Sequence, residues 1–393
     1  MGMKIHSGRI SVRRTWPSGV FLLVLLGFST DGFAQGLPRV EPGIEYVHHR
    51  VGAGPWSIHV VKVDRSVPRF QFVSTLAQDH VYGLASVREQ VVTLQDSRVR
   101  PIVAVNGDFF VIRPGPYQGD PLGLHIVRGE LVSSPTGVGF WIDRDGRPHI
   151  GEVAARFRAT GLNGLDLAFG FNQERADGAA VLYTPTVGAS TRTNAGLELI
   201  LEKSGGGDWL PLRAGSSYRA RVAALVEQGN AELTSATMVL SIGPVLAQKL
   251  AAPMLGDVIT LDLATSPDLT GATVAIGGGP ILLDAGKSPE WSGPQPRHPR
   301  TALGWNDEQF VLAVVDGRQR DLSAGMTCPE LASLMKRLGC EYAVNLDGGG
   351  SSTLWLDGCV MNSPSDGRER AVANSLIVVA VEPNDAGEAV ENR

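Results

Sequence analysis

The chain has 393 residues, 43% of them hydrophobic and 19% charged, so it can bury a sizeable core as one large domain or two smaller ones. Its formal net charge is -5, and it becomes -8 without residues 1–35, which contain four Lys or Arg and one Asp. An acidic chain repels polyanions, so we expect no nucleic-acid partner. The 48 glycines and 24 prolines predict many turns between short strands.

The N-terminus predicts an export signal. Arg13 and Arg14 precede the apolar stretch Val20–Phe28, and small residues before Gln35 offer a cleavage site. The apolar stretch is too short for a confident membrane span, although an uncleaved anchor stays open as an alternative. We therefore expect residues 1–35 to be a signal peptide and the mature protein to be periplasmic or secreted, without a stable membrane span.

Short alternating runs between residues 36 and 100 predict strands, including Ser57–Val63 and Phe70–Val73. Apolar residues at helical spacing predict one helix, with a buried stripe at Leu84, Val87, Val91 and Leu94.

The segment Pro101–Phe110, written PIVAVNGDFF, predicts a buried strand that ends in the polar sequence Asn106-Gly107-Asp108. The Pro- and Gly-rich loop Arg113–Pro121 follows, and it could cover a pocket. From Leu122 to about Leu263, apolar runs separated by turn residues predict a long series of strands.

A glycine triple, Gly277 to Gly279, then lies between two apolar runs. It is followed by the segment RTALG, which begins at Arg300, and by the strand Phe310–Val315. That strand ends in Asp316-Gly317-Arg318, where the aspartate is as typical of a turn as of catalysis.

The segment Thr327–Leu338 predicts the best-defined helix of the chain. Thr327 is a suitable N-cap, Glu330 completes a capping box, and Gly339 ends the helix. A buried stripe is expected from its apolar residues, which are Leu331, Leu334, Met335 and Leu338.

The helix leads into Tyr342–Trp355, YAVNLDGGGSSTLW, around which we expect the site to be organised. Asn345 and Asp347 end an apolar strand, and the glycines after them allow a ligand to approach the backbone. Backbone N–H groups in such a turn can hold an anion. The structural alternative is a plain hairpin in which Asp347 is only a turn residue.

The three cysteines leave at least one thiol unpaired within the chain, and their spacing matches no zinc pattern. If the strands on either side of residues 347–350 form a regular hairpin, Cys340 and Cys359 lie opposite each other and can form a disulfide. Buried free thiols, including Cys328, are the alternative.

The ordered set VNGDFF, AIGGGP, RTALGW, VVDGR, the capped helix, NLDGGGSSTLW and SPSDGRERAVAN resembles the phosphodiester glycosidase family. The resemblance runs from about Pro101 to Val381, and residues 36–100 match only loosely. Asp108 departs from the pattern, because the family usually has a small residue there.

The resemblance implies hydrolysis of the glycosidic bond of a sugar-1-phosphodiester, such as one of N-acetylglucosamine, in envelope or exopolysaccharide metabolism. This chemistry needs a carboxyl group at the bond, a cation at the phosphate, and N–H groups for the remaining oxygens. The candidate catalytic residues are Asp347, Asp316, Asp108 and Arg300. The candidate substrate-binding residues are Asn106, Gly107, Gly277, Gly278, Gly279, Thr301, Asn345, Gly348, Gly349, Gly350, Ser351, Ser352 and Arg370.

Several of these residues also have a structural interpretation. Arg300 could form a surface ion pair, and Asn106 and Asn345 could cap strand ends. His125 and His298 lack a spaced partner and are interpreted as structural. The carboxylates could bind Ca²⁺ or Mg²⁺, which prefer oxygen ligands, so a metal requirement stays open.

We expect an α+β fold, with β-rich mixed or paired sheets and a few covering helices, in a single catalytic domain. The expected division is a signal peptide at 1–35, a β-rich lead-in at 36–100, the phosphodiester glycosidase domain at 101–382 and a disordered tail at 383–393. The alternative function is a non-catalytic periplasmic protein that binds sugar phosphates or polysaccharide. A structural envelope protein, the third hypothesis, predicts no pocket at the glycine turns.

Overall fold

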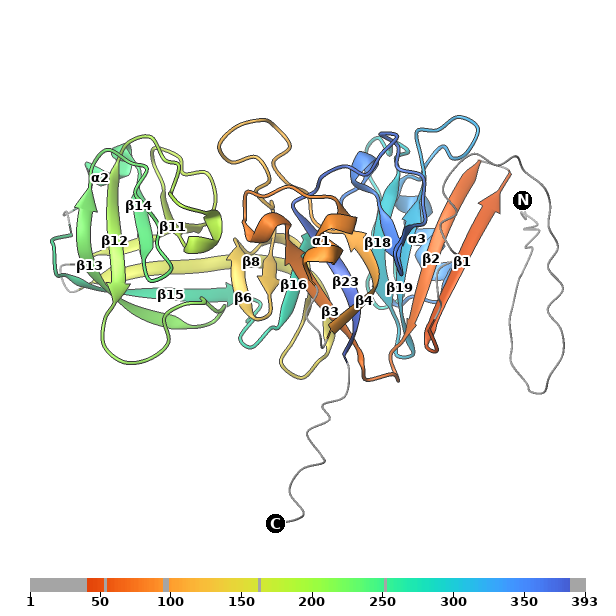
Figure 1. Cartoon of the computed structure of the whole chain (residues 1–393), viewed down its shortest axis with the longest axis horizontal. Coiled ribbons are helices and arrows are strands. Elements are labelled where there is room, and N and C mark those ends of the chain that lie inside the picture. Colours follow the sequence, from red (N-terminus) through yellow and green to blue (C-terminus); the bar gives the residue numbers. More distant parts are fainter. Residues whose placement is uncertain (1–40, 53–54, 95–98, 162–163, 251–252, 382–393) are drawn as a thin grey trace, which may run out of the picture.

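The computed structural model describes residues 41–52, 55–94, 99–161, 164–250 and 253–381. The expected signal peptide and the expected C-terminal tail lie outside these ranges. The described chain is elongated and consists mainly of strands arranged in three sheets (Figure 1). Within it, no helix is both long and apolar enough to cross a membrane.

The first sheet has six antiparallel strands in the order β1-β2-β19-β18-β20-β17. They are β1 (Ile44–Val51), β2 (Trp56–Asp64), β19 (Gln309–Val315), β18 (Arg300–Trp305), β20 (Tyr342–Asn345) and β17 (Ile281–Leu283). Side chains alternate between its faces: Ile58 and Val60 pack beneath helix α3 (Cys328–Arg337), whereas Val61 and Val63 face the second sheet.

The second sheet has five antiparallel strands in the order β22-β21-β4-β23-β3. They are β22 (Cys359–Val360), β21 (Leu354–Leu356), β4 (Val99–Asn106), β23 (Asn374–Val381) and β3 (Phe70–Leu76). One face shares an apolar core with the first sheet, and the other packs against helix α1.

The third sheet has twelve strands, is nearly closed, and surrounds an apolar core of its own. Its path runs through β10 (Gly170–Phe171), β11 (Ala180–Tyr183), β14 (Met238–Ile242), β12 (Leu197–Lys203), β13 (Ser217–Val226), β15 (Val258–Ser266), β8 (Pro148–Gly161), β7 (Thr136–Ile142), β16 (Val274–Gly278), β5 (His125–Val127) and β6 (Glu130–Ser133), and β9 (Asp166–Ala168) pairs with β8. Phe140 on β7 and Ile276 on β16 reach into the core between the first two sheets, so the three sheets meet there.

The described helices are short. They are α1 (Val87–Thr93), α2 (Pro244–Ala247) and α3 (Cys328–Arg337), with 3₁₀ turns η1 (Ala77–Asp79), η2 (Pro185–Val187) and η3 (Gly349–Ser351). Both predicted helices are confirmed, and each begins with a capping box, at Ser86 for α1 and at Thr327 for α3. The expectation of a β-rich fold is also confirmed, but the α+β class overstated the helices: the molecule is mainly β.

The hairpin expected around residues 347–350 is absent. β20 pairs with β18 and β17 in the first sheet, whereas β21 pairs with β4 and β22 in the second. The glycine segment is therefore a crossover between two packed sheets. Because there is no hairpin, Cys340 and Cys359 are not brought together as expected, and Cys340 is a buried free thiol.

Candidate functional site

Six strand ends that carry the predicted motifs meet at one end of the two packed sheets. β4, β16, β19 and β20 end there, and β18 and β23 begin there. The backbone joins them directly: Asp347 N donates to Gly107 O at 2.9 Å, and Gly279 N donates to Asn345 O at 2.7 Å. Segments far apart in the sequence are thus fixed against one another.

Asn106 is the buried centre of this junction. Its Nδ2 donates to Asp347 O at 2.7 Å, and its Oδ1 accepts from Thr301 Oγ1 at 2.7 Å and from Thr353 N at 3.1 Å. With its donor and acceptor both used inside the protein, Asn106 holds the strand ends in place. The structure gives Thr301 the same supporting role.

The glycine triple at 277–279 allows close packing of backbones. A Cβ atom at Gly277 would lie 2.3 Å from Asp108 Oδ2, and one at Gly278 would lie 2.7 Å from Asn345 O. The Asn345 side chain closes the contact by donating from Nδ2 to Gly279 O at 2.7 Å. These glycines therefore serve the junction, because no larger residue fits.

Asp347 is the half-buried carboxylate at this junction. Its Oδ1 accepts from Gly348 N at 2.7 Å. Burial raises its pKa above the usual range, although the Ser351 hydroxyl, the Gly348 N–H and two arginines each act to lower it. The pKa remains raised, so this carboxyl group can hold a proton at a higher pH than an ordinary aspartate.

The two arginines next to Asp347 are Arg318 and Arg370. A Cβ atom at Gly349 would lie 3.0 Å from Arg318 Nη1, and one at Gly350 would lie 2.1 Å from Arg370 Nη2. The glycines thus leave room for the two guanidinium groups. Gly349 also has φ +64°, a conformation that glycine adopts at little cost.

The two arginines are held differently. Arg370 forms an ion pair with Asp366 at 2.7 Å and lies 3.4 Å from Ser351 Oγ. Arg318 is exposed, and its Nη2 lies 3.2 Å from His298 Nδ1. Burial, Arg318 and Arg300 lower the pKa of His298, so at neutral pH the ring is uncharged and can accept this hydrogen bond.

Arg300, the predicted phosphate ligand, lies at the same end of the sheet but is bound to the backbone. Its Nε donates to Met326 O at 2.9 Å and its Nη2 donates to Pro296 O at 3.0 Å. No carboxylate forms an ion pair with it among the described residues. Part of its hydrogen-bonding capacity is therefore used to hold the loop before β18.

Asp108 is almost fully buried, and both carboxylate oxygens are engaged. Oδ1 accepts from Phe109 N and Oδ2 accepts from Gly123 N, each at 2.7 Å. Burial raises its pKa to about 7, against these two hydrogen bonds, and the charge of Asp347 adds to the increase. Asp108 is thus a neighbour of Asp347 that fastens the loop between residues 109 and 123.

Asp316 is buried in a separate network. Its Oδ2 accepts from Ser57 Oγ at 2.7 Å and lies 3.1 Å from His59 Nε2, while its Oδ1 accepts from Ser363 N at 2.8 Å and Asn362 Nδ2 at 3.4 Å. Burial alone would raise its pKa, but the hydrogen bonds from His59, Ser57 and Ser363 hold the pKa below the usual value.

Sequence reasoning did not select Arg318, Ser57 or His59, and it interpreted His298 as structural. Arg318 belonged to the VVDGR motif and could have been selected as a cation three residues after a strand end. Ser57 and His59 gave no local signal, because their partner Asp316 is more than 250 residues away.

The remaining predicted site residues also lie near the junction. Ser351 and Ser352 are buried in and after η3, and Ser352 Oγ has no hydrogen-bond partner among the described residues. The described residues contain no group of three or more His, Cys, Asp or Glu side chains that could hold a metal ion.

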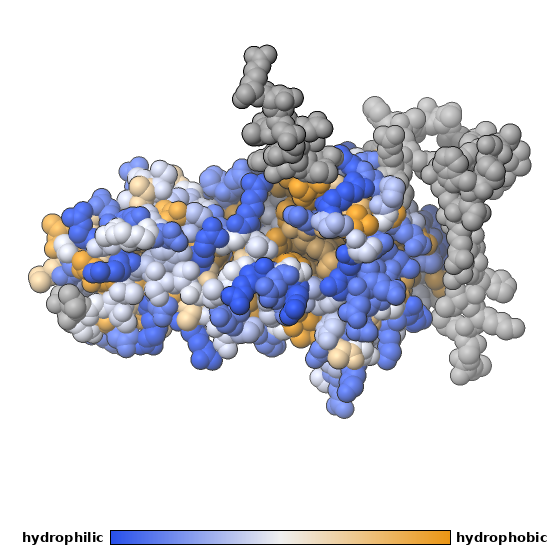
Figure 2. Space-filling view, turned by 90° about the horizontal axis from the view of Figure 1, so that it is seen from below, coloured by the Kyte–Doolittle hydropathy of each residue, from blue (hydrophilic) through white to orange (hydrophobic). Residues whose placement is uncertain are grey.

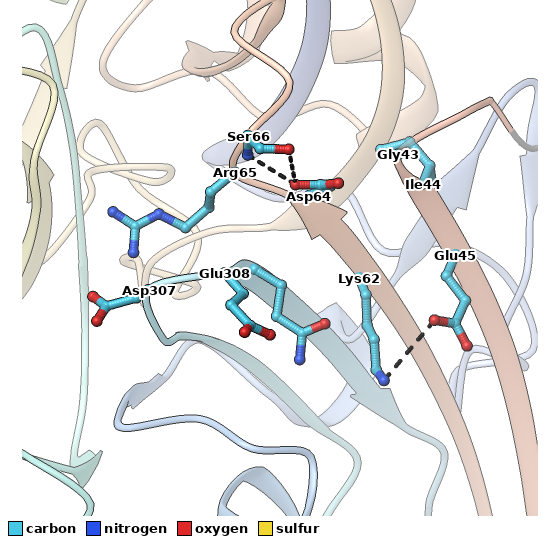
Figure 3. A pocket seen from close by; sticks show the side chains of 10 residues that line it. Gly43, Ile44, Glu45, Lys62, Asp64, Arg65, Ser66, Asp307 and Glu308 are labelled. Atoms are coloured by element: carbon cyan, nitrogen blue, oxygen red, sulfur yellow. Dashed lines mark hydrogen bonds and ion pairs between the residues drawn. The ribbon is translucent and has the colours of Figure 1, made fainter.

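A groove of about 780 Å³ lies at the other end of β2 and β19 (Figure 3). Its charged groups largely pair with neighbours: Lys62 lies 3.9 Å from Glu45, and Asp64 accepts from Ser66. It contains none of the predicted motifs. Seen from below, the molecule has a largely hydrophilic surface with a few apolar areas (Figure 2).

Comparison with known proteins supports the resemblance. Residues 226–379 match the model of the phosphodiester glycosidase family. Over 89 residues the chain is 42% identical to YomE, an uncharacterised protein derived from the SPbeta prophage of Bacillus subtilis. That match covers 22% of this chain and only 14% of YomE.

Three solved structures are similar. A hypothetical protein from Synechocystis is 20% identical with a TM-score of 0.68, covering 86% of this chain and 62% of that one. A candidate exported protein from Burkholderia pseudomallei is 22% identical with a TM-score of 0.64, covering 83% and 74%. These two share the fold.

The catalytic domain of zebrafish N-acetylglucosamine-1-phosphodiester alpha-N-acetylglucosaminidase is 17% identical with a TM-score of 0.44, covering 86% of this chain and 84% of that one. The family match includes Arg300, Asp316 and the Asp347 turn, whereas Asp108 lies outside it. The similarity to the phosphodiester glycosidase family is therefore supported over residues 226–379, which are less than half of the chain.

Proposed function

We propose that the protein is a hydrolase that cleaves the glycosidic bond of a sugar-1-phosphodiester. The observation that carries this proposal is the placement of Asp347, a half-buried carboxyl group with a raised pKa, beside the guanidinium groups of Arg318 and Arg370. Two cations next to one proton-holding carboxyl group suit a phosphate leaving group better than a neutral one.

In the proposed reaction, Arg318 and Arg370 bind the phosphate oxygens and Asp347 acts as a general acid. The C1–O bond breaks, its electron pair goes to the bridging oxygen, and that oxygen receives the proton of Asp347. Water then forms the new bond to C1 and returns a proton to Asp347, so one sugar and one phosphomonoester leave. Asn106 and the glycines hold Asp347 in position.

The substrate class and location are part of the proposal. A sugar of the N-acetylglucosamine type, in envelope or exopolysaccharide material, follows from the family resemblance. Export follows from the Arg-flanked apolar stretch near the N-terminus.

Hydrolysis in ¹⁸O-labelled water tests the proposal. The purified protein is incubated with an α-N-acetylglucosamine-1-phosphodiester, and the products are analysed by mass spectrometry. Cleavage of the glycosidic bond places ¹⁸O in the sugar, whereas cleavage of a P–O bond places ¹⁸O in the phosphate.

Two controls complete the experiment. Asp347→Asn should release no sugar above background, and a parallel reaction with a chelator reports whether Ca²⁺ or Mg²⁺ is needed. Label in the phosphate would assign a different hydrolase activity. Tight binding of the diester without release of sugar would instead identify the non-catalytic binding protein.

A further inference from the structure

The loop after β4 carries an unusual group of apolar side chains. Phe109, Ile112 and Leu122 are 36%, 58% and 54% exposed, and they are three of the eight large apolar side chains exposed among the described residues. Phe109 and Leu122 are neighbours, because Leu122 N donates to Phe109 O at 2.9 Å. Water-exposed apolar groups gathered in this way favour contact with a ligand.

The base of this loop is fastened to the candidate site. The Asp108 carboxylate accepts from the backbone of Phe109 on one side and of Gly123 on the other. Asp108 in turn lies close enough to Asp347 for the charge of Asp347 to raise its pKa.

The tip of the loop is anchored as well. Tyr117 Oη donates to Arg192 O at 3.0 Å, and Arg192 Nη1 donates to Pro116 O at 2.6 Å. The Tyr117 ring also packs edge-on against Tyr82, with 5.4 Å between the ring centroids. The loop is held at both its base and its tip, so the exposed side chains of Phe109 and Leu122 form a fixed apolar surface before any ligand binds. We call this surface the wall.

The wall and the arginines approach Asp347 from different segments. Arg318 and Arg370 pack over Gly349 and Gly350, after Asp347 in the chain, whereas the wall is tied to it through Gly107 and Asp108. If the phosphate lies on the arginines, the part of the substrate on the other side of the scissile bond is the sugar. A pyranose ring presents a face of C–H groups that is apolar and can cover such a surface.

We infer that Phe109 and Leu122 form the sugar-binding wall, against which the C–H face of the pyranose ring packs. The inference rests on the proposed function, because it uses the arginines to define the phosphate side. It names residues that determine specificity, and it assigns the loop after β4 to substrate binding.

The test uses the full mature chain and the double variant Phe109→Ser/Leu122→Ser. The matched control is Leu225→Ser/Val245→Ser, which removes two apolar side chains that are 41% and 46% exposed on the third sheet and α2. Binding of methyl α-N-acetylglucosaminide is measured by saturation-transfer NMR, which reports the ring protons in contact, and binding of inorganic phosphate is measured by calorimetry.

We expect the wall variant to bind the glycoside about tenfold more weakly, to lose transfer to the C–H protons of one ring face, and to bind phosphate unchanged. Glycoside binding equal to that of the control, or no glycoside binding by the wild type, would overturn the inference. Hydrolysis of the diester by a wall variant with unaltered binding would leave the proposed function standing. Glycoside binding through the wall without any hydrolysis would instead reject the proposed function, while the inference that the wall binds the sugar would stand.

Discussion

Two segments that follow strands of the first sheet contain Asp-Gly, and their carboxylates have different surroundings. Asp316, after β19, is 1% exposed and receives hydrogen bonds from four residues. Asp347, after β20, is half-buried and has two guanidinium groups beside it. The pKa of Asp316 is lowered and that of Asp347 is raised.

The two pKa values differ because the two carboxylates accept different hydrogen bonds from the protein. Burial acts on both groups in the same direction, raising the pKa. At Asp316 the hydrogen bonds outweigh burial, which makes the group a permanent anion that joins β2, β19 and the segment after β22. At Asp347 burial outweighs them, which leaves a group that can exchange a proton with a substrate. An Asp-Gly sequence alone therefore does not identify a catalytic residue.

The largest effect is expected for Asp347→Asn. Asparagine keeps the size of the side chain but cannot donate an acidic proton, so turnover should fall by about two orders of magnitude or more. The melting temperature should stay near that of the wild type, because the amide oxygen of asparagine can still accept the hydrogen bonds that Gly348 N and Ser351 donate. Kinetics and calorimetry on the same sample check both parts. A folded variant with near-normal turnover would make Asp347 a structural residue, like Asp316.

Asp316→Asn should lower the stability of the fold and leave turnover nearly unchanged. The amide would direct N–H groups at residues that now donate to the carboxylate, and buried donors without acceptors destabilise a fold by about 1–3 kcal/mol each. Denaturant unfolding should show this loss, while turnover per folded molecule stays within a few-fold of the wild type. A stable Asp316→Asn variant with no turnover would show that the two aspartates had been assigned the wrong way round.

Arg318→Lys sharpens the comparison at the phosphate side. Lysine keeps the charge but loses the planar pair of donors, so kcat/KM should fall by about tenfold, the scale of one charge-assisted hydrogen bond. Arg300→Lys is the matched variant: two of its donors are bound to backbone carbonyls, so we expect a loss of stability with a smaller change in kcat/KM. Equal kinetic losses in the two variants would mean that both arginines bind the phosphate.

Asp120→Asn is expected to have the smallest effect on turnover, and it changes the pH dependence of stability. Asp120 has fewer hydrogen-bond partners than Asp316. Asp120 is 5% exposed, its Oδ1 has no partner among the described residues, and burial raises its pKa to about 8. The folded state therefore keeps a proton that the unfolded state releases near pH 4, so the contribution of Asp120 to stability falls as pH rises from 4 to 8.

The asparagine variant lacks this titration. Its melting temperature relative to the wild type should rise across pH 4–8 and then stay constant. A difference that does not change with pH would show that Asp120 is ionised in the folded protein. Asp145→Asn, on the exposed turn after β7, is the control for an Asp-to-Asn substitution at the surface.

The sequence predicted features that depend on neighbouring residues. The capping box at Thr327, the buried stripe of α3 and the strand before Asp347 are local patterns, and the structure contains all three. The resemblance also located the family segment around Arg300 and Asp347.

Features that depend on which distant segments pair with each other could not be predicted from local sequence patterns. No local sequence pattern distinguishes a glycine turn within a hairpin from a glycine crossover between sheets. The expected Cys340–Cys359 pairing depended on a hairpin, and it was therefore wrong. Likewise, Ser57 and His59 have no pattern that connects them with Asp316, because only the pairing of β2 with β19 brings them together. The exposed wall at Phe109 and Leu122 depends on contacts with Asp108 and Arg192 that are set by tertiary packing.

The position of β23 has a consequence for the timing of folding. This strand lies between β3 and β4 and supplies Asn374, whose backbone carbonyl accepts from Gly107 N. Until residues 374–381 have left the ribosome, β3 has no partner and one edge of β4 is open. The nascent chain therefore cannot complete the junction around Asp347 or its second sheet until β23 has been synthesised.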